Sequence, residues 1–343
     1  MRAMCVTEYG QPLQLMELPT PSPPPGYALL QVLTCGLCFS DVKTVRGHMP
    51  YSPGLRLPHV AGHEVCGRVV EVNGPSSRIS VGDRVVTYHV WGCRECASCR
   101  RGEEQICLNP RAWMGFTHPG GFQEFLAVPV EYLLPVPERL PDHLAPALTC
   151  ALGTAYRAVV SRGATAPGER VLVLGLGGVG LHAALIAQAL GARTMGVEAT
   201  EQKALAAQKS GVHEVTFGSN VRDLVTEQTN GEMADVVIET TGVPALLEQA
   251  RLMCRPGGRI VSVGYHVGEM MATSSDQLVL LEQSVLGSRY ASREDMERGI
   301  RMVADGLFTP VVDEVLDLED VNSAIGKLEA GTVNGRLALT VAR

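Results

Sequence analysis

The sequence predicts an α/β protein with two domains, a mostly antiparallel β domain and a doubly wound parallel sheet. The chain has 343 residues, more than the roughly 250–300 residues at which single hydrophobic cores stop growing. It is 45% hydrophobic, which is enough for two sizeable cores. Short β-type runs fill the first part of the chain, and strands alternate with helices afterwards, a pattern typical of a parallel sheet.

The first part, residues 1 to about 150, is rich in Pro, Gly and short apolar runs. Strands of this length broken by turns predict a compact, mostly antiparallel β domain. The expected strands lie at 27–36, 63–72, 82–88 and 121–129. We interpret the Pro-rich segment 19–27 as a connector between strands, with a ligand for a proline-binding module as the alternative.

The second part begins near residues 146–153, where apolar strands start to alternate with helices. The expected strands lie at 171–175, 194–200, 214–218, 234–242, 258–265 and 284–291. Helices are expected between them at 182–191, 201–211, 221–229, 244–253 and 274–283. Six apolar strands at this interval predict a parallel, doubly wound sheet. A helix at 293–306 and a short β tail at 334–341 follow.

The composition argues against several classes of protein. The net charge of −7 and the lack of a basic run argue against nucleic acid as the main partner. The N-terminus has no apolar core of a signal peptide, and no stretch approaches the roughly 20 apolar residues of a membrane span. Ten cysteines in such a chain are expected to be metal ligands and free thiols, in a cytoplasmic protein.

Four cysteines within fifteen residues form the sharpest motif of the chain. Cys93, Cys96, Cys99 and Cys107 follow the pattern C-x2-C-x2-C-x7-C. Two-residue spacers let neighbouring thiolates converge, and a structural zinc takes four such ligands. Because all four positions are filled by sulfur, we expect this zinc to hold a loop together and not to bind substrate. The alternative is a disulfide pair.

A glycine-rich loop predicts a dinucleotide site. Gly175, Gly177 and Gly180 have G-x-G-x-x-G spacing, directly after an apolar strand and before a helix. This context places a pyrophosphate at the N-terminus of the helix. Glu198 ends the next strand, where a carboxylate accepts hydrogen bonds from ribose hydroxyls and repels a 2′-phosphate, so NAD is preferred to NADP. The alternative for Glu198 is an ordinary solvated side chain.

Three further residues are potential ligands of a second zinc. Cys38, His63 and Cys150 make a Cys2His set, which leaves a fourth position for water or substrate. They are spread over 112 residues, so spacing alone would not group them. A buried Cys is also often a small apolar filler.

Taken together, these motifs resemble the zinc-containing medium-chain alcohol dehydrogenases over essentially the whole chain. The resemblance includes Gly36-Leu37-Cys38-Phe39-Ser40-Asp41, Gly62-His63-Glu64, the cysteine quartet, GLGGVG and a terminal GRLAL around Arg336. It implies a GroES-like catalytic domain, residues 1–153 and 292–343, split around a Rossmann NAD-binding domain, residues 154–291, with the active cleft between them. Two zinc ions per chain are expected, one catalytic and one structural.

The resemblance also implies roles for individual residues. Cys38, His63 and Cys150 match the catalytic zinc ligands, and Glu64 matches an acidic residue behind the metal that can coordinate it transiently. Ser40 matches the hydroxyl that passes on the substrate proton, and Asp41 is expected to orient the imidazole ligand. The implied coenzyme-binding residues are Thr154, Gly175, Gly177, Gly178, Val179, Gly180, Glu198, Lys203, Val263 and Arg336. Thr154 and Val263 would contact the nicotinamide, Lys203 a ribose and Arg336 the pyrophosphate.

Two residues depart from the family pattern. Phe39 stands where Arg or His often contacts the pyrophosphate, and Lys43 stands where a His commonly completes the proton relay. Lysine is a poor neutral proton acceptor unless burial lowers its pKa. We expect Lys43 on a solvated face, with the relay ending at the ribose hydroxyl and bulk water or using His48.

The implied function is hydride transfer between a small-molecule alcohol (primary, secondary or polyol) and NAD, which gives an aldehyde or ketone. His89, Trp91, Trp113 and Met114 flank segments that line the cleft in relatives, so an apolar or aromatic-tolerant pocket is expected. Alternatives are a specialised hydroxy substrate (a threonine-like amino alcohol or a hydroxyacyl thioester), a C=C reductase of the same superfamily, or a non-catalytic NAD-binding protein. No nucleic-acid or membrane partner is expected, and family habit suggests a homotetramer or homodimer.

Overall fold

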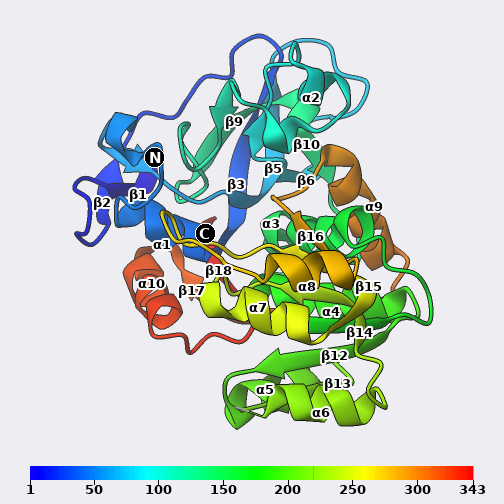
Figure 1. Ribbon diagram of the computed structural model, residues 1–343. Coiled ribbons are helices and arrows are strands. Elements are labelled where there is room, and N and C mark those ends of the chain that lie inside the picture. Colours follow the sequence, from blue (N-terminus) through cyan, green and yellow to red (C-terminus); the bar gives the residue numbers. More distant parts are fainter. Residues whose placement is uncertain (219, 343) are drawn as a thin grey trace. The chain divides into compact units, whose positions relative to one another are not determined.

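The computed structural model describes residues 1–218 and 220–342 and divides into two compact units (Figure 1). The first unit comprises Met1–Cys150, Ser292–Asp305 and Val312–Arg343. The second comprises Ala151–Ala291 and Gly306–Val311. No helix in the described part of the chain is long and apolar enough to cross a membrane.

The first unit is built on a seven-stranded sheet of order β10-β6-β5-β3-β18-β17, with β9 also paired to β3. These strands are β3 (Tyr27–Leu37), β5 (Glu64–Val72), β6 (Arg84–Thr87), β9 (Phe125–Pro129), β10 (Leu133–Pro135), β17 (Val312–Asp317) and β18 (Arg336–Thr340). All neighbours are antiparallel except β17 and β18, which pair in parallel. The predicted mostly antiparallel domain is confirmed, and the segment 19–27 does connect two strands.

Smaller elements complete this unit. A three-stranded sheet contains β1 (Arg2–Val6), β2 (Gln14–Glu17) and β4 (His59–Val60), and a two-stranded ladder contains β7 (Val90–Trp91) and β8 (Ala112–Trp113). The helices are α1 (Phe39–Val45), α2 (Ala97–Arg100), α9 (Arg293–Ala304) and α10 (Val321–Glu329), with 3-10 turns at Ser52–Gly54, Glu104–Ile106, Val130–Tyr132, Ala145–Leu148 and Leu318–Asp320. The short helix α1 and the helix α10 were not predicted from the sequence.

The second unit contains a parallel sheet of order β13-β12-β11-β14-β15-β16. Its strands are β11 (Arg170–Leu174), β12 (Arg193–Glu198), β13 (Glu214–Phe217), β14 (Ala234–Glu239), β15 (Cys254–Ser262) and β16 (Ser284–Gly287). The helices are α4 (Gly178–Ala189), α5 (Glu201–Lys209), α6 (Val221–Gln228), α7 (Pro244–Leu252) and α8 (Ser275–Leu280). The helix α3 (Cys150–Tyr156) and a π-helical turn (Arg157–Arg162) precede the sheet.

The predicted doubly wound sheet is therefore confirmed, with all six strands in place. The first strand, β11, lies in the middle of the sheet. The chain adds β12 and β13 on one side of β11 and then β14, β15 and β16 on the other side, as in Rossmann folds. Leu172, Val237 and Ile260 from the strands pack with Val225 of α6 and Leu247 of α7 in the buried core. The helix α4 begins four residues earlier than expected, because glycines at its N-terminus hid the helical signal.

Candidate metal centre and coenzyme loop

The register of three strands brings the predicted metal ligands of the first unit together. Gly36 of β3 lies opposite Glu64 of β5, and Leu37 lies opposite Leu337 of β18. Cys38 directly follows β3, His63 directly precedes β5, and Arg336 begins β18. Residues that are far apart in the sequence therefore meet at one end of the sheet.

The four predicted residues form one compact cluster. One donor atom each of Cys38, His63, Glu64 and Cys150 lies within 4.8 Å of all the others. Cys150 joins the cluster from the start of α3, directly after the turn Ala145–Leu148 and Thr149. Two sulfurs and one imidazole nitrogen are the donors that zinc prefers, so the residues fit this metal.

A buried carboxylate orients two of these ligands. Asp41 Oδ1 lies 2.9 Å from His63 Nδ1, and Asp41 Oδ2 accepts a hydrogen bond from the backbone N–H of Cys38 at 2.9 Å. Because Nδ1 faces the carboxylate, Nε2 is the ring nitrogen left for the cluster. Burial lowers the pKa of His63, but the Asp41 carboxylate outweighs it and holds the pKa well above its usual value.

A hydrogen bond between the two thiols of this cluster favours the thiolate form of Cys38. The Cys150 thiol donates to Cys38, which holds the pKa of Cys38 well below its ordinary value despite burial. The positive charge of Arg336 lowers the pKa of Cys38 further. Thiolate is the form that binds metal, so the cluster favours the ligating state of Cys38.

Glu64 and Arg336 form a buried pair behind the ligands. Arg336 Nη2 lies 3.0 Å from Glu64 Oε1, and Glu64 Oε1 lies 3.9 Å from His63 Nε2. Burial raises the pKa of Glu64 to about 7, although Arg336 opposes the shift. Apart from this ion pair, neither Glu64 oxygen accepts a hydrogen bond from any described residue, which leaves the carboxylate able to contact a metal ion as well. Arg336, predicted to contact a pyrophosphate, is only 6% exposed and is paired with Glu64.

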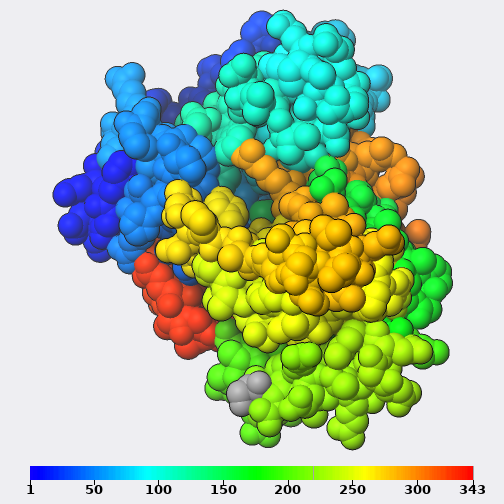
Figure 2. Space-filling model, in the orientation of Figure 1, coloured from blue at the N-terminus to red at the C-terminus, as the bar shows by residue number. Residues whose placement is uncertain are grey.

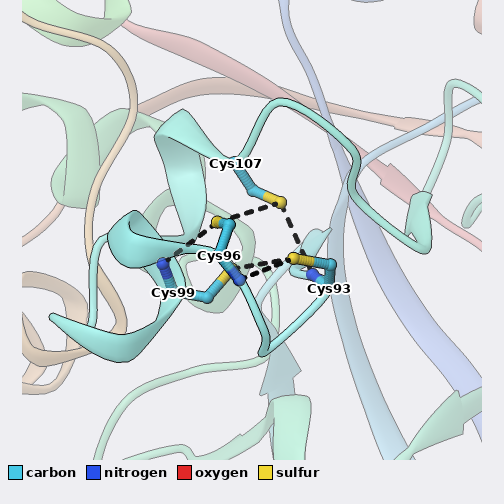
Figure 3. A group of neighbouring side chains, drawn as sticks. All are labelled: Cys93, Cys96, Cys99 and Cys107. Atoms are coloured by element: carbon cyan, nitrogen blue, oxygen red, sulfur yellow. Dashed lines mark hydrogen bonds between the residues drawn. The ribbon is translucent and has the colours of Figure 1, made fainter.

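The cysteine quartet forms a second compact cluster (Figure 3). The sulfurs of Cys93 and Cys99 lie 3.8 Å apart, and those of Cys96 and Cys107 lie 3.9 Å apart. Backbone N–H groups of Cys96 and Cys99 donate to the sulfurs of Cys93 and Cys96 at 3.4 Å. Hydrogen bonds from such donors stabilise the thiolate form of cysteine, and four sulfurs at this separation fit a tetrahedral zinc. No disulfide joins the described cysteines.

The residues around the predicted proton path lie on α1. Ser40 stands in its first turn and is partly exposed, and Lys43 lies one turn later. We expected Lys43 on a solvated face, but the structure shows it half-buried. Its Nζ lies 5.9 Å from the centre of the Phe39 ring, and burial lowers the pKa of Lys43. The two departures from the family pattern thus contact each other. His48 is exposed beyond the end of the helix.

Aromatic rings surround the imidazole ligand. The centres of the His89 and Phe116 rings lie 4.9 and 4.7 Å from that of His63. Tyr51 packs edge-on against Trp113 and Phe116. His89, which we expected to flank a cleft-lining segment, lies beside the predicted ligand His63, whereas Phe116 and Tyr51 were not singled out from the sequence. Both are ordinary aromatic residues in loops and have no distinguishing local pattern.

In the second unit, each glycine of the loop has its own reason to be glycine. Gly175 has φ +83°, in the left-handed region that favours glycine. A Cβ at Gly180 would overlap the carbonyl oxygen of Gly175, so the helix packs directly on the turn. A Cβ at Gly177 would have no atom within 4 Å. This open side is where a pyrophosphate can approach the backbone, so the loop fits a dinucleotide.

Glu198 lies beside this loop, at the carboxyl end of β12. One oxygen accepts a hydrogen bond from the backbone N–H of Leu176 at 2.7 Å, and the other accepts from Ala199 at 3.1 Å. Lys203 follows in the first turn of α5. Val263 directly follows β15, and its N–H donates to the Glu239 carbonyl. Thr154 is buried in α3.

The polar residues at the end of β14, where Thr240 contacts the glycine loop, were not singled out from the sequence. Thr240 Oγ1 donates to the carbonyl oxygens of Gly175 and Leu174 at 2.8 and 3.0 Å. The buried Glu239 carboxylate accepts from the N–H groups of Thr241 and Gly242. The Thr240 bonds tie the end of β14 to the glycine loop, and the Glu239 bonds shape the turn that follows β14. The available signal was a polar Glu-Thr-Thr-Gly run directly after a buried strand, which we included in the strand.

A cavity of about 350 Å³ lies at the amino-terminal ends of the strands of this sheet, opposite the glycine loop. Residues at the amino ends of four strands line it, among them Arg170, Arg193, Glu214 and Ala234. Ligands of open parallel sheets bind at the carboxyl ends of the strands. The cavity is therefore distinct from the candidate coenzyme loop.

The chain resembles known proteins along its entire length. Residues 24–138 match the family model described as alcohol dehydrogenase GroES-like domain, and residues 178–305 match that described as zinc-binding dehydrogenase. An alcohol dehydrogenase of Geobacillus stearothermophilus is 32% identical over 99% of this chain and 98% of its own length. An acryloyl-coenzyme A reductase of Metallosphaera sedula is 33% identical over 99% of this chain and 100% of its own length.

Solved structures agree with this similarity. A crystal structure of an NAD-dependent alcohol dehydrogenase is 30% identical, covers 100% of both chains and has a TM-score of 0.91. The crystal structure of AibC is 32% identical, covers 100% of this chain and 96% of its own, and has a TM-score of 0.92.

Proposed function

The chain belongs to the family of zinc-binding dehydrogenases with a GroES-like alcohol dehydrogenase domain, and we propose that it oxidises an alcohol to an aldehyde or ketone with NAD. The same site reduces the carbonyl compound in the reverse direction. The convergence of Cys38, His63 and Cys150 on one point, with Glu64 behind them, carries the proposal. A site of three protein ligands leaves a position for substrate, as catalytic zinc sites do.

Cys38, His63 and Cys150 would hold the catalytic zinc, and the cysteine quartet would hold a structural zinc, making two per chain. When bound, zinc supplies a Lewis acid for the substrate oxygen and NAD accepts the hydride. Asp41 keeps the His63 ring in the tautomer that presents Nε2. Arg336 places a positive charge beside Glu64 and Cys38, which offsets the negative charge of the ligand set.

The proton of the alcohol leaves by way of this chain's own residues. Ser40 stands two residues after Cys38 in the first turn of α1 and is partly exposed. Its hydroxyl can accept the proton of a substrate hydroxyl and pass it towards water. Aromatic rings of His89 and Phe116 contact the His63 ring and exclude water from that side of the ligand. They also support an apolar or aromatic-tolerant pocket.

The glycine loop and the first turn of α4 would bind the pyrophosphate of NAD. Glu198 would accept hydrogen bonds from the adenosine ribose and repel a 2′-phosphate, which supports NAD over NADP. Thr154, Lys203 and Val263 stay predicted coenzyme contacts. The domain limits, 1–153 with 292–343 and 154–291, and a cytoplasmic location also stay predictions.

Reduction of an activated C=C bond is the second candidate. A relative of 33% identity is named acryloyl-coenzyme A reductase, which favours this reading or a related hydroxyacyl thioester substrate. The three ligands Cys38, His63 and Cys150 argue for alcohol chemistry instead, because polarising a hydroxyl or carbonyl oxygen is what an open zinc site does.

An activity screen with metal analysis on the same sample separates the two. The panel contains primary and secondary alcohols, polyols, amino alcohols, hydroxyacyl thioesters and enoyl thioesters, each with NAD or NADH. We expect NAD-linked turnover of alcohols and two zinc per chain. Turnover of enoyl thioesters alone, or full activity of the folded protein without zinc, would overturn the proposal.

We also propose that the chain assembles into a homotetramer or homodimer. β16 is an edge strand of its sheet, and Val285 on it is 38% exposed. Val279 and Leu280 of α8, the helix that precedes this strand, are 72% and 74% exposed. The segment that contains α8 lies in gold on the face turned to the viewer in Figure 2. An exposed apolar edge strand is a template for pairing with a second chain.

A further inference from the structure

We propose that His182 is a positioning residue for the coenzyme, because its ring fixes the first turn of α4 in the geometry that pyrophosphate binding needs. The proposal rests on the proposed use of NAD. His182 lies on α4, four residues after Gly178, the first residue of the helix. It is fully buried, so both of its ring nitrogens need hydrogen-bond partners within the protein.

Both ring nitrogens of His182 have backbone partners. Nδ1 lies 2.6 Å from the carbonyl oxygen of Gly178, and Nε2 lies 3.2 Å from the backbone nitrogen of Val311. Val311 ends the segment Gly306–Val311, which belongs to the same unit as α4. The ring therefore links the coenzyme loop to a segment more than a hundred residues away in the sequence.

These partners settle the tautomer of the ring. A backbone N–H only donates, so Nε2 must be the acceptor for Val311. A neutral imidazole carries its proton on the other nitrogen, so Nδ1–H donates to the Gly178 carbonyl. A carbonyl only accepts, and the two bonds are therefore mutually consistent in one tautomer. The Val311 bond holds the ring in the orientation that points Nδ1–H at Gly178.

Gly178 is the point where the loop becomes a helix. The N–H groups of this first turn are those that bind phosphate at a helix N-terminus, and the neighbouring Gly177 faces open space. Thr240 holds the loop at Gly175, before the open residue. His182 holds it at Gly178, after the open residue. Together they keep the exposed stretch between them from adopting the many conformations open to glycine.

Two amide variants separate the two bonds of the ring. The side-chain nitrogen of H182N can occupy the position of Nδ1 and donate to Gly178, but it does not reach Val311. The longer side chain of H182Q reaches the position of Nε2 and can accept from Val311, but it removes the side-chain donor to the Gly178 carbonyl. Ile186→Val, one turn later on α4 and also fully buried, is the control for simple loss of packing.

The test is the Kd of NADH, measured by fluorescence well below the unfolding temperature of each variant. We expect H182Q to weaken NADH binding about tenfold, which corresponds to about 1.4 kcal/mol, and H182N to stay within about threefold of the parent. Hydrogen exchange should show the converse at Val311, whose amide loses protection in H182N and keeps it in H182Q. I186V should lower the unfolding temperature and leave the Kd unchanged.

Equal Kd values for NADH in H182Q, H182N and the parent would overturn the proposal. A greater loss of NADH affinity in H182N than in H182Q would also overturn it. Both outcomes would leave the proposed function standing. A parent protein that binds no NADH would overturn both together. The two failures are distinguishable because the binding of NADH by the parent is measured first and needs neither substrate nor turnover.

Discussion

At the scale of single residues, a few buried polar side chains decide the geometry of the candidate sites. Asp41 contacts His63 and the backbone of Cys38 at once, so one carboxylate fixes a ligand and the turn that carries another. Glu198 likewise contacts the backbone of the glycine loop through Leu176. Substitutions of these two residues therefore test the metal centre and the coenzyme loop separately.

Asp41→Asn should reduce zinc affinity at the catalytic site by about 10–100-fold, because the amide keeps the shape but loses the charge that orients and polarises His63. Competition with a chromophoric chelator measures this affinity. Asp295→Asn is the control, since Asp295 is a buried capping carboxylate of α9 in the same unit. It should lower stability by about 0.5–2 kcal/mol without releasing zinc. Unchanged zinc affinity in Asp41→Asn would contradict the assigned role.

Glu198→Ser should erode the preference for NAD over NADP, because the charge that repels a 2′-phosphate is lost. The measurement is the ratio of kcat/KM for the two coenzymes, which should fall by about tenfold or more. The exposed Glu201 in the first turn of α5 gives a matched control, Glu201→Ser, with little change. An unaltered ratio in Glu198→Ser would refute the ribose contact.

At the scale of secondary-structure elements, turns and strand ends carry the functional groups. The glycine loop connects β11 to α4, the segment that carries the cysteine quartet contains the short helix α2, and Cys38 is the N-cap residue of α1. Such elements are short of apolar contacts, so they depend on glycine geometry or on metal for their shape. The two predictions at this scale test the role of glycine geometry in the glycine loop and the role of a bound metal in the cysteine segment.

Gly177→Ala and Gly180→Ala should fail in different ways. An alanine at 180 would overlap the Gly175 carbonyl and should lower the free energy of unfolding by about 1–3 kcal/mol. An alanine at 177 has free space and should change stability by less than about 1 kcal/mol, yet block the approach of the pyrophosphate and raise the NADH Kd about tenfold or more. Thermal unfolding and NADH titration of both variants check this. Normal NADH binding by Gly177→Ala would count against the loop as the phosphate site.

Cys96→Ser should remove the structural zinc and loosen the segment 93–107. Because structural zinc contributes directly to folding, the free energy of unfolding should fall by several kcal/mol, on the order of 3. Zinc content should drop by one ion, and limited proteolysis should cut within the segment. Ser98→Ala on α2 is the control. Retention of both zinc ions by Cys96→Ser would show that the quartet is not the second site.

At the scale of the whole molecule, the fold class and family could be predicted because the relevant patterns are local. Six apolar runs spaced by helical segments predict the parallel sheet, and β16 proved shorter than the predicted 284–291 because the run leaves the sheet after Gly287. The helix α10 was not predicted. The parallel pairing of β17 with β18 was not predicted either, because pairing partners depend on topology and not on local pattern.

The exposed edge of the second unit leads to a prediction about assembly. Val285→Lys places a charge on the edge strand β16, where lysine disfavours pairing with another strand. Light scattering should show a smaller assembly than the parent. Leu205→Lys is the matched control, because Leu205 on α5 is also exposed, at 49%, and lies away from this edge in the sheet order. A parent protein that is already monomeric would contradict the proposed oligomer.

The sequence by itself determined the cysteine quartet and the glycine loop, because each lies within about fifteen neighbouring residues whose spacing alone brings the groups together. Only the tertiary structure decided that Cys38, His63 and Cys150 converge, since their meeting depends on the register of β3 and β5 and on the turn before α3. It alone revealed the buried Glu64–Arg336 pair, the contact of Thr240 with the loop and the bonds of His182. Long-range contacts of this kind leave no periodic signal in a single sequence, because the chain between the partners can vary in length without changing where they meet.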